Sequence, residues 1–244
     1  MKTYKTTGIA IKSLKLGEAD KIITFLTTGG KVSAVAKGIR RTSSKFGGRL
    51  EPGNDVELVL AHGRALDTVT QVSIKKARPW LRSDLDKLEV AYAILELADK
   101  LTPEAVEGDR LLELTAAALD RLEVESRLPL LLLAFDIKAL AMTGFLPYFS
   151  ACVICGGKAG LNQMGPAEGG FICDNCFSGQ RSVKVSKEAK ELVRQLLGVR
   201  LLNLDSVMTH TGIINEVRRV VWEHVMYHVH ADFKARTGTG ISGR

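Results

Sequence analysis

The chain has 244 residues, of which 45% are hydrophobic and 25% charged, a composition that excludes a disordered or fibrous protein. Its most apolar run, Leu128 to Phe135, is far shorter than the ~20 residues that a membrane-spanning helix needs. Residues Met1 to Lys5 lead into no apolar run of the kind that forms the core of a secretion signal. We therefore expect a cytoplasmic protein with no membrane partner.

The net charge of +7 is unevenly distributed along the chain. Residues 1–80 carry 15 Lys and Arg against 6 Asp and Glu, residues 81–148 carry 7 against 13, and residues 149–244 carry 12 against 8. A basic N-terminal part favours a polyanionic ligand, and an acidic middle favours solvation or a protein partner. The charge pattern thus points to nucleic acid as the ligand of the first 80 residues.

The first 80 residues show the alternation of β-forming and polar residues that is typical of strands. Five strands are predicted, at Tyr4–Leu14, Lys21–Leu26, Val32–Lys37, Asp55–Leu60 and Leu66–Ile74. The link after the third strand is longer than the others. Five strands with that link predict an oligonucleotide/oligosaccharide-binding (OB) barrel, and a five-stranded barrel of the SH3 kind is the alternative.

From Ser83 onward the apolar residues recur at helical spacing. Helices are expected from about Leu85 to Thr102, Asp109 to Glu125, Leu128 to Thr143, Ser186 to Leu197 and Gly212 to Phe233. The third is apolar nearly all round, which is typical of a buried core helix. The predicted fold is therefore α+β and multidomain: an OB domain at residues 1–80, then an all-helical domain at 81–244 that carries a four-cysteine zinc module at 149–180.

All four cysteines fall in two matched pairs, Cys152-x-x-Cys155 and Cys173-x-x-Cys176. Two such pairs at this spacing are the pattern of a tetrahedral zinc site, and glycines beside each pair suit turns that wrap around an ion. The alternatives are two disulfides or four unrelated thiols, but disulfide frameworks belong to short secreted chains. Four ligands leave no open position, so we predict one structural Zn²⁺ and no catalytic role.

A basic segment, Lys37 to Arg49, is the second informative stretch. It holds five cations, three hydroxyls and one aromatic ring among glycines; the expected DNA-binding residues in it are Lys37, Arg40, Arg41, Lys45, Phe46 and Arg49. Cations neutralise phosphates, and a ring offers a platform on which a base stacks. Lys75 and Lys76 could extend this surface. A solvated basic loop is the alternative for the segment, and a place in the barrel core is the alternative for Phe46.

No constellation of catalytic residues is found. The sequence contains no G-x-x-x-x-G-K-[ST] motif, so no P-loop nucleotide hydrolysis is expected. His224 and His228 are spaced i, i+4 but lack the glutamate that follows the first histidine of a zinc protease. No H-x-E motif accompanies the cysteines, as it would in a zinc deaminase. We therefore do not expect an enzyme.

Four stretches have a recognisable family pattern: Leu16–Thr24, Gly30–Arg40, Lys45–Pro52, and later Gly144–Pro147 followed by the first cysteine pair. In these stretches the chain resembles the RecO family of bacterial DNA repair proteins. The resemblance spans the chain and is most specific in residues 16–52. It implies an OB fold, a helical domain and a zinc module, and a protein without nucleotide hydrolysis. The resemblance implies that Lys37, Arg40, Lys45 and Arg49 contact DNA. For Arg41, Lys75 and Lys76 the same expectation rests on their charge alone.

The resemblance also implies a function in recombinational repair. Such proteins bind single- and double-stranded DNA and anneal complementary strands. With RecR, and in some routes RecF, they help load RecA onto strands covered by single-strand-binding protein, at the nucleoid. Two other functions remain open: a metal-dependent nuclease, and a zinc-containing scaffold whose acidic helices bind proteins.

Overall fold

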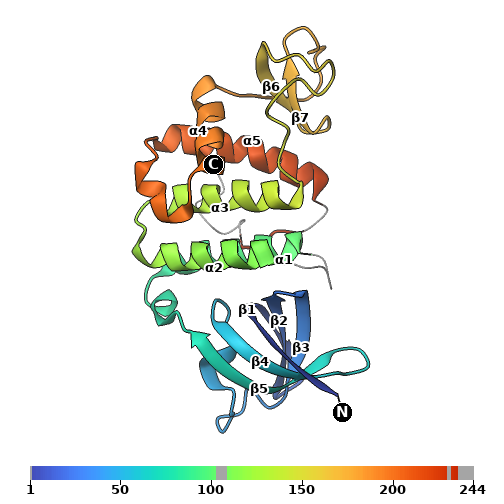
Figure 1. Ribbon diagram of the computed structural model, residues 1–244, viewed down its shortest axis with the longest axis vertical. Helices are drawn as coiled ribbons and strands as arrows, with labels where there is room; N and C mark the ends of the chain where they lie inside the picture. The colour runs from blue at the N-terminus through green and yellow to red at the C-terminus, as the bar shows by residue number, and fades with distance from the viewer. Residues whose placement is uncertain (1, 103–108, 230–231, 236–244) are drawn as a thin grey trace. The chain divides into compact units, whose positions relative to one another are not determined.

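Figure 1 shows the computed structural model, which describes residues 2–102, 109–229 and 232–235. The chain divides into two compact units, Met1–Ser126 and Arg127–Arg244. Within the described ranges, no helix combines the length and the apolar character needed to cross a membrane.

The first unit contains a closed five-stranded barrel. Its strands are β1 (Thr3–Leu16), β2 (Asp20–Thr27), β3 (Gly30–Ala36), β4 (Asp55–Ala61) and β5 (Asp67–Lys76). They follow one another around the barrel as β1-β2-β3-β5-β4, with β1 also paired to β4. All pairs are antiparallel except β3 with β5. This arrangement confirms the predicted OB-like barrel.

The barrel closes because β1 is long enough to pair with two neighbours. Residues Thr3–Ile9 pair with β4, and residues from Gly8 onward pair with β2, so Gly8 belongs to both ladders. A Cβ atom on Gly8 would lie 2.3 Å from the carbonyl oxygen of Leu26. Glycine is therefore required where β1 changes partner, because backbone approaches too closely for any side chain.

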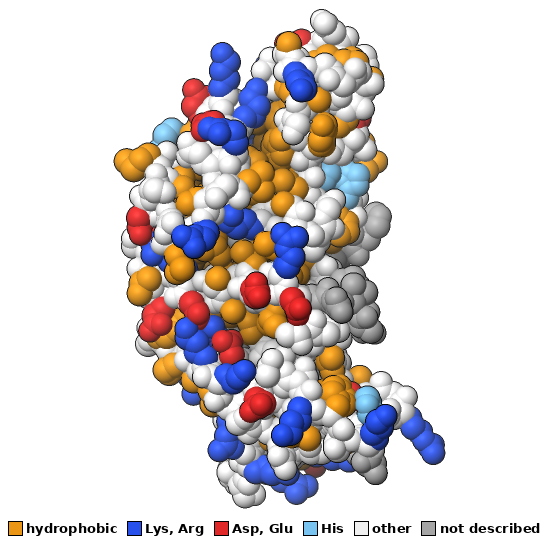
Figure 2. Space-filling model, viewed as in Figure 1, with side chains coloured by type: hydrophobic (Ala, Val, Ile, Leu, Met, Phe, Trp, Pro, Cys, Tyr) orange, Lys and Arg blue, Asp and Glu red, His pale blue; other side chains and the backbone are white. Residues whose placement is uncertain are grey.

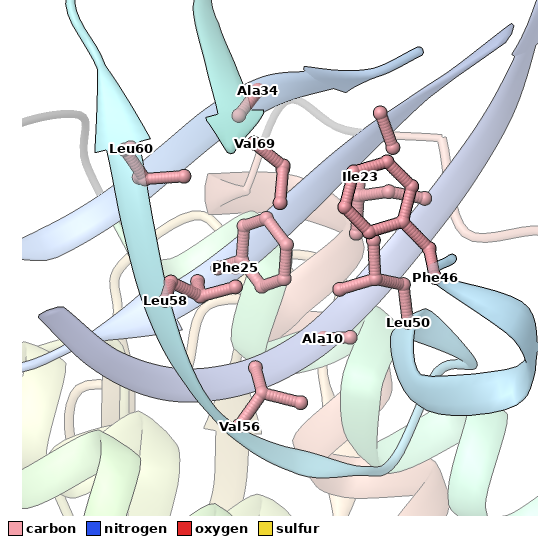
Figure 3. Close-up of a cluster of buried hydrophobic side chains, with 11 residues drawn as sticks. Ala10, Ile23, Phe25, Ala34, Phe46, Leu50, Val56, Leu58, Leu60 and Val69 are labelled. Carbon is pink, nitrogen blue, oxygen red and sulfur yellow. The ribbon is translucent and has the colours of Figure 1, made fainter. Parts of the chain in front are cut away.

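The barrel interior is filled by side chains from every strand (Figure 3). The alternation of β2 and β4 directs Ile23 and Phe25, and Val56, Leu58 and Leu60, inward. The segment after β3 adds two more residues. Its short 3-10 helix η1 (Gly47–Leu50) supplies Leu50, and Phe46 precedes it; both are buried in the same cluster. The basic segment is thus part of the barrel wall.

Two helices complete the first unit. A short 3-10 helix, η2 (Pro79–Arg82), leads from the barrel to α1 (Leu85–Leu101), and α2 (Asp109–Val124) follows. Asp99 of α1 accepts ion pairs from Lys12 at 3.4 Å and Lys31 at 3.2 Å, on two barrel strands. These ion pairs join α1 to the barrel within the first unit.

A buried arginine makes the second link between the barrel and the helices. The Arg78 side chain is only 1% exposed and donates to Asp55 of β4 at 2.7 Å and to Asp120 of α2 at 2.6 Å. Burial alone would raise the pKa of Asp120, but hydrogen bonds from Lys76 and Arg78 outweigh burial and lower it. A buried charge persists only when it is paired in this way.

The second unit is built on α3 (Leu128–Thr143), which matches the predicted helix and has buried residues on all faces. It packs with α4 (Lys187–Gly198), α5 (Thr211–His228) and the 3-10 helix η3 (Leu201–Ser206). Asp136 is fully buried in α3 and accepts a hydrogen bond from the indole nitrogen of Trp222 at 3.4 Å. The predicted end of the last helix at Phe233 passes through residues 230–231, which lie outside the described ranges.

The cysteines lie in a small module between α3 and α4. It contains a three-stranded antiparallel sheet in the order β7-β6-β8, from β6 (Leu161–Gly165), β7 (Gly170–Cys173) and β8 (Val183–Lys184). These strands are too short and too rich in glycine to be predicted from sequence periodicity. The expected domain boundary at residue 80 stays a prediction. Along the sequence, the boundary between the two compact units follows Ser126.

Candidate metal centre and nucleic-acid interface

The first cysteine pair lies in a tight turn. The amide of Cys152 donates to the carbonyl of Gly157 at 2.8 Å, and the amide of Gly156 donates back to the carbonyl of Cys152 at 2.8 Å. Gly156 has a φ of +75°, a conformation that costs glycine nothing. This turn directs the sulfurs of Cys152 and Cys155 toward the same point.

The second pair begins at the end of β7. Cys173 is the last residue of the strand, and the amide of Cys176 donates to its carbonyl at 3.0 Å. The Cys173 amide also donates to the sulfur of Cys152 at 3.4 Å, so a hydrogen bond joins the two pairs. Ile172 packs beside the sulfurs in a small core.

The four sulfurs form a cluster of the size that a metal requires. All four lie within 4.8 Å of one another, and the sulfurs of Cys155 and Cys173 are 3.7 Å apart. Four thiolates at about 2.3 Å from a tetrahedral zinc would be separated by about 3.8 Å. The four cysteines are free thiols in the structure, which does not support the alternative of two disulfides. The donor set and its spacing therefore fit a metal ion.

The electrostatics of the cluster also suit a metal. The backbone amide of Cys173 lowers the pKa of Cys152 to about 6, because that hydrogen bond stabilises the thiolate. Hydrogen bonds to neighbouring thiols, first that of Cys155, raise the pKa of Cys176 to about 12. Four thiolates cannot share this space without a cation, and a bound metal would release the remaining protons.

The structure places all seven predicted DNA-binding cations at the surface: Lys37, Arg40, Arg41, Lys45, Arg49, Lys75 and Lys76. Lys and Arg side chains gather over the barrel at the lower end of Figure 2. Among the residues that the structure describes, no carboxylate forms an ion pair with the five cations of the basic segment. Their charge is available to an anionic ligand.

The basic segment is fixed to the barrel at both ends. At its start, the Gly38 amide donates to Asp20 at 2.7 Å, and Arg40 donates from its amide to Ala19 at 2.9 Å and from its side chain to Gly17 at 3.1 Å. At its end, the Asn54 side chain donates to the carbonyl of Gly48 at 3.1 Å. The cations are therefore presented by an ordered segment beside the β1–β2 turn.

The two lysines at the end of β5 differ from each other. Lys76 forms an ion pair with Asp120 of α2 at 2.8 Å, so part of its charge is already neutralised. Lys75 is exposed, and within the described ranges it has no such partner. Of the two residues expected to extend the DNA-binding surface, Lys75 has the more available charge.

Phe46 requires a correction. The sequence predicts that its ring stacks on a base, but Phe46 is 2% exposed and points into the barrel core beside Ile23 and Leu50 (Figure 3). A ring in this position has no free face for a ligand. The structure supports the alternative, a core role, because the segment turns inward at Phe46 to close the barrel. Strand periodicity could not reveal this, since Phe46 lies outside any strand.

Sequence reasoning missed a pair of rings on the barrel. Tyr4 near the start of β1 and His62 in the β4–β5 turn are stacked, with ring centroids 4.7 Å apart and planes inclined by 26°. The motif His62-Gly63-Arg64 indicated a turn, but nothing in it indicated the partner ring, 58 residues away. Only the β1–β4 register, which pairs Tyr4 with Leu60, brings the two together.

Comparison with known proteins gives a consistent result across the chain. Residues 1–78 match the family model described as "Recombination protein O N terminal", and residues 82–237 match "Recombination protein O C terminal". The two models thus meet between the barrel and α1.

Curated relatives cover the same length. A DNA repair protein RecO of Rubrobacter xylanophilus is 34% identical over 252 aligned residues, covering 100% of this chain and 99% of the relative. One of Frankia casuarinae is 40% identical over 203 residues, with 81% and 82% covered. One of Pelotomaculum thermopropionicum is 30% identical over 238 residues, with 96% and 93% covered. With an OB-like barrel, a helical unit and a four-cysteine cluster, the chain belongs to the RecO family of DNA repair proteins.

Proposed function

We propose that the chain is a non-enzymatic recombination mediator that binds single- and double-stranded DNA and anneals complementary strands. With RecR, and in some routes RecF, it would help load RecA onto strands covered by single-strand-binding protein. A protein with this task acts at the nucleoid, where the DNA is. Membership of the RecO family supports the field of action, DNA repair.

The observation that carries the proposal is the charge of the basic segment. Lys37, Arg40, Arg41, Lys45 and Arg49 are exposed within thirteen residues, and none is paired with a carboxylate among the described residues. Each phosphate that such a cation neutralises releases a condensed counterion, which drives binding without regard to sequence. Annealing needs this property, because a mediator must accept any pair of complementary strands.

The cysteine cluster supports a structural zinc ion. Cys152, Cys155, Cys173 and Cys176 would supply all four ligands, so a bound Zn²⁺ would retain no position for a reacting water. In the part of the chain that the structure describes, this is the one grouping of three or more potential metal ligands that was found. The proposal is therefore that zinc folds the module, while the barrel at residues 1–80 contacts DNA.

A salt titration of DNA binding tests the barrel surface. With about five phosphates neutralised on a single strand, log K against log salt should have a slope near −3.5, from ~0.7 per contact. Replacing Arg40 and Arg41 with alanine should reduce that slope by about 1.4. The matched control is Lys187→Ala with Arg194→Ala, two exposed cations of α4, which removes the same net charge from the second unit.

Equal slopes for the wild type and the Arg40/Arg41 variant would mean that the segment is a solvated loop and that the scaffold function is correct. Annealing is measured in the same samples with fluorescently labelled complementary strands, without ATP or added metal. Strand cleavage that follows the protein through purification and disappears in a point variant would instead support the nuclease.

A further inference from the structure

The β4–β5 turn carries a cluster of three side chains that the proposed DNA surface does not yet include. Tyr4 donates its hydroxyl to Asp67 at 2.5 Å, and the ring of Tyr4 stacks on His62. His62 Nδ1 lies 3.6 Å from the other oxygen of Asp67. Burial, and then the hydrogen bond to Asp67, raise the pKa of Tyr4 far above its usual value, so the phenol stays a donor. The imidazole is thus supported from one side, while 55% of the His62 side chain is exposed.

The turn is built in a way that fixes His62 in place. The His62 amide donates to the carbonyl of Lys2 at 3.0 Å, and the Gly63 amide donates to Asp67 at 3.2 Å. A Cβ atom on Gly63 would lie 1.9 Å from the carbonyl oxygen of Leu66, so only glycine allows the turn to close. An exposed ring held by both its backbone and its neighbour loses little conformational freedom when it binds a ligand.

A count of the rings in the barrel singles out this pair. Residues 2–78 contain four ring side chains other than proline: Tyr4, Phe25, Phe46 and His62. Phe25 and Phe46 are buried in the core. Tyr4 is half-buried and His62 is exposed. Among the rings of residues 2–78, a base can therefore stack only on the Tyr4–His62 pair. Trp80 follows the barrel in η2, is half-buried, and has the Lys87 ammonium 5.8 Å from its ring centroid.

The fold also brings the pair close to the basic segment. Asp67 pairs with Ala34 across the parallel β3–β5 ladder, and the basic segment starts three residues after Ala34, at Lys37. Farther along β5, the Lys45 ammonium donates to the carbonyl of Thr70 at 3.3 Å. Arg64, two residues after His62, is exposed in the turn itself. The Lys45 ammonium, which can bind a phosphate, and the His62 ring, which can bind a base, thus both lie beside β5.

We propose that an unpaired base of single-stranded nucleic acid stacks on the exposed face of His62, with Tyr4 and Asp67 as positioning residues behind it. This inference rests on the proposed function and adds a contact that distinguishes single strands from duplexes. In a duplex, both faces of a base are covered by its neighbours in the stack. Phosphate contacts position the strand but do not touch the bases. A mediator with this contact would hold bases apart from their neighbours before pairing.

The alternative is that the cluster only fastens the β4–β5 turn. Two substitutions at His62 separate these roles, because they change the ring and the polar contact in opposite ways. His62→Phe keeps a ring and loses the interaction with Asp67. His62→Asn keeps a short polar side chain next to the turn and loses the ring. Stacking predicts that the Phe variant binds like the wild type and the Asn variant binds weakly, whereas fastening predicts that the Asn variant is the better tolerated.

The measurement is fluorescence anisotropy with a labelled oligothymidylate, together with quenching of an oligonucleotide that carries 2-aminopurine. Losing one stacked base should weaken the affinity of the Asn variant for the single strand by about 5- to 150-fold. The salt slope should stay unchanged, because no phosphate contact is lost. Duplex affinity should also be unchanged, and the Phe variant should restore both single-strand affinity and 2-aminopurine quenching.

The outcomes separate this inference from the proposed function. If the wild-type protein shows no salt-dependent binding, the proposed function fails and the stacking contact fails with it. If the wild type binds with the expected salt slope and His62→Asn binds the single strand equally well, only the stacking contact is overturned. An equal loss on single strand and duplex, or a Phe variant as weak as the Asn variant, also overturns it. The melting temperatures of both variants are also measured. We expect His62→Asn to be the more stable variant and His62→Phe to bind the single strand more tightly.

Discussion

The cysteine cluster and the basic segment are two sites of opposite kinds. The cluster is defined by four atoms within 4.8 Å, contributed by two short turns, and each ligand is indispensable to the geometry. The segment spreads five exposed cations over thirteen residues, and phosphate contacts of this kind are individually small and interchangeable. A site of the first kind fails when one residue changes. A site of the second kind weakens in steps.

The same contrast explains why the two sites differ in what their sequences reveal. Ligand spacing in the cluster is local, so two Cys-x-x-Cys pairs indicate the donor set before any fold is known. The orientation of a side chain in the segment depends on what the barrel places beneath it. Phe46 shows this, because it lies between two exposed cations, Lys45 and Arg49, yet belongs to the core. Three perturbations test this contrast.

Loss of the metal should have the largest effect. Replacing Cys173 with serine, or removing zinc with a chelator, should abolish a stoichiometry of one zinc per chain and unfold the module at residues 149–180. Zinc supplies about 10–16 kcal/mol of binding free energy in small zinc-dependent peptides, far more than a module of this size can replace. Elemental analysis and hydrogen exchange are the measurements. Zinc-free protein with unchanged exchange in this module would contradict a structural role, and the barrel serves as the internal control.

Truncation of Phe46 should have the next largest effect. Phe46→Ala should destabilise the first unit by about 3–5 kcal/mol, because it removes a buried ring and leaves a cavity in the barrel. Phe46→Leu should recover most of that loss. Chemical denaturation gives the stability, and DNA affinity is measured well below the melting temperature. Weaker binding by Phe46→Ala with no loss of stability would restore the stacking role that the structure argues against.

A pH effect in the second unit should be the smallest. Burial, with the neighbouring ring of His228, lowers the pKa of His224 to about 4, so the native state favours the neutral ring. An unfolded histidine takes up a proton near pH 6.5, so His224 contributes stability that is complete above pH 6.5 and is lost as the pH falls toward 4. The loss between pH 7 and pH 5 should be on the order of 1 kcal/mol.

The variant His224→Leu should reduce this pH dependence, and His210→Gln, a change at an exposed histidine, should not. Denaturation of zinc-loaded protein at both pH values gives the comparison. Identical pH dependence in the wild type and His224→Leu would show that this ring does not titrate as its burial implies. The result bears on the metal module. The rings of His228 and His224 are tilted by 40° with centroids 4.3 Å apart, and His228 contacts the carbonyl of Pro166 in the β6–β7 turn at 2.7 Å.

The sequence was sufficient for those elements whose pattern is local. The five strands, the five helices and the cysteine pairs all follow from periodicity, turn residues and spacing, and α3 lies at Leu128–Thr143 as expected. Contacts between distant residues could not be predicted in the same way. Arg78 reads as one more cation of a basic barrel, yet it is the buried partner of Asp55 and Asp120. The Tyr4–His62 pair is hidden for the same reason, because it depends on strand register.

The parallel ladder between β3 and β5 has a consequence for folding. It contains two residue pairs, Ala34 with Asp67 and Val35 with Thr68, whereas every antiparallel ladder of the barrel is longer. The β1-β2-β3 meander and the β4-β5 hairpin are each local in sequence, so we expect them to form before this seam joins them. The basic segment follows β3 at this seam, and its Phe46 and the adjacent Leu50 are buried in a core that takes side chains from all five strands. DNA bound across the segment would therefore slow the opening of the barrel at the place where it closes last.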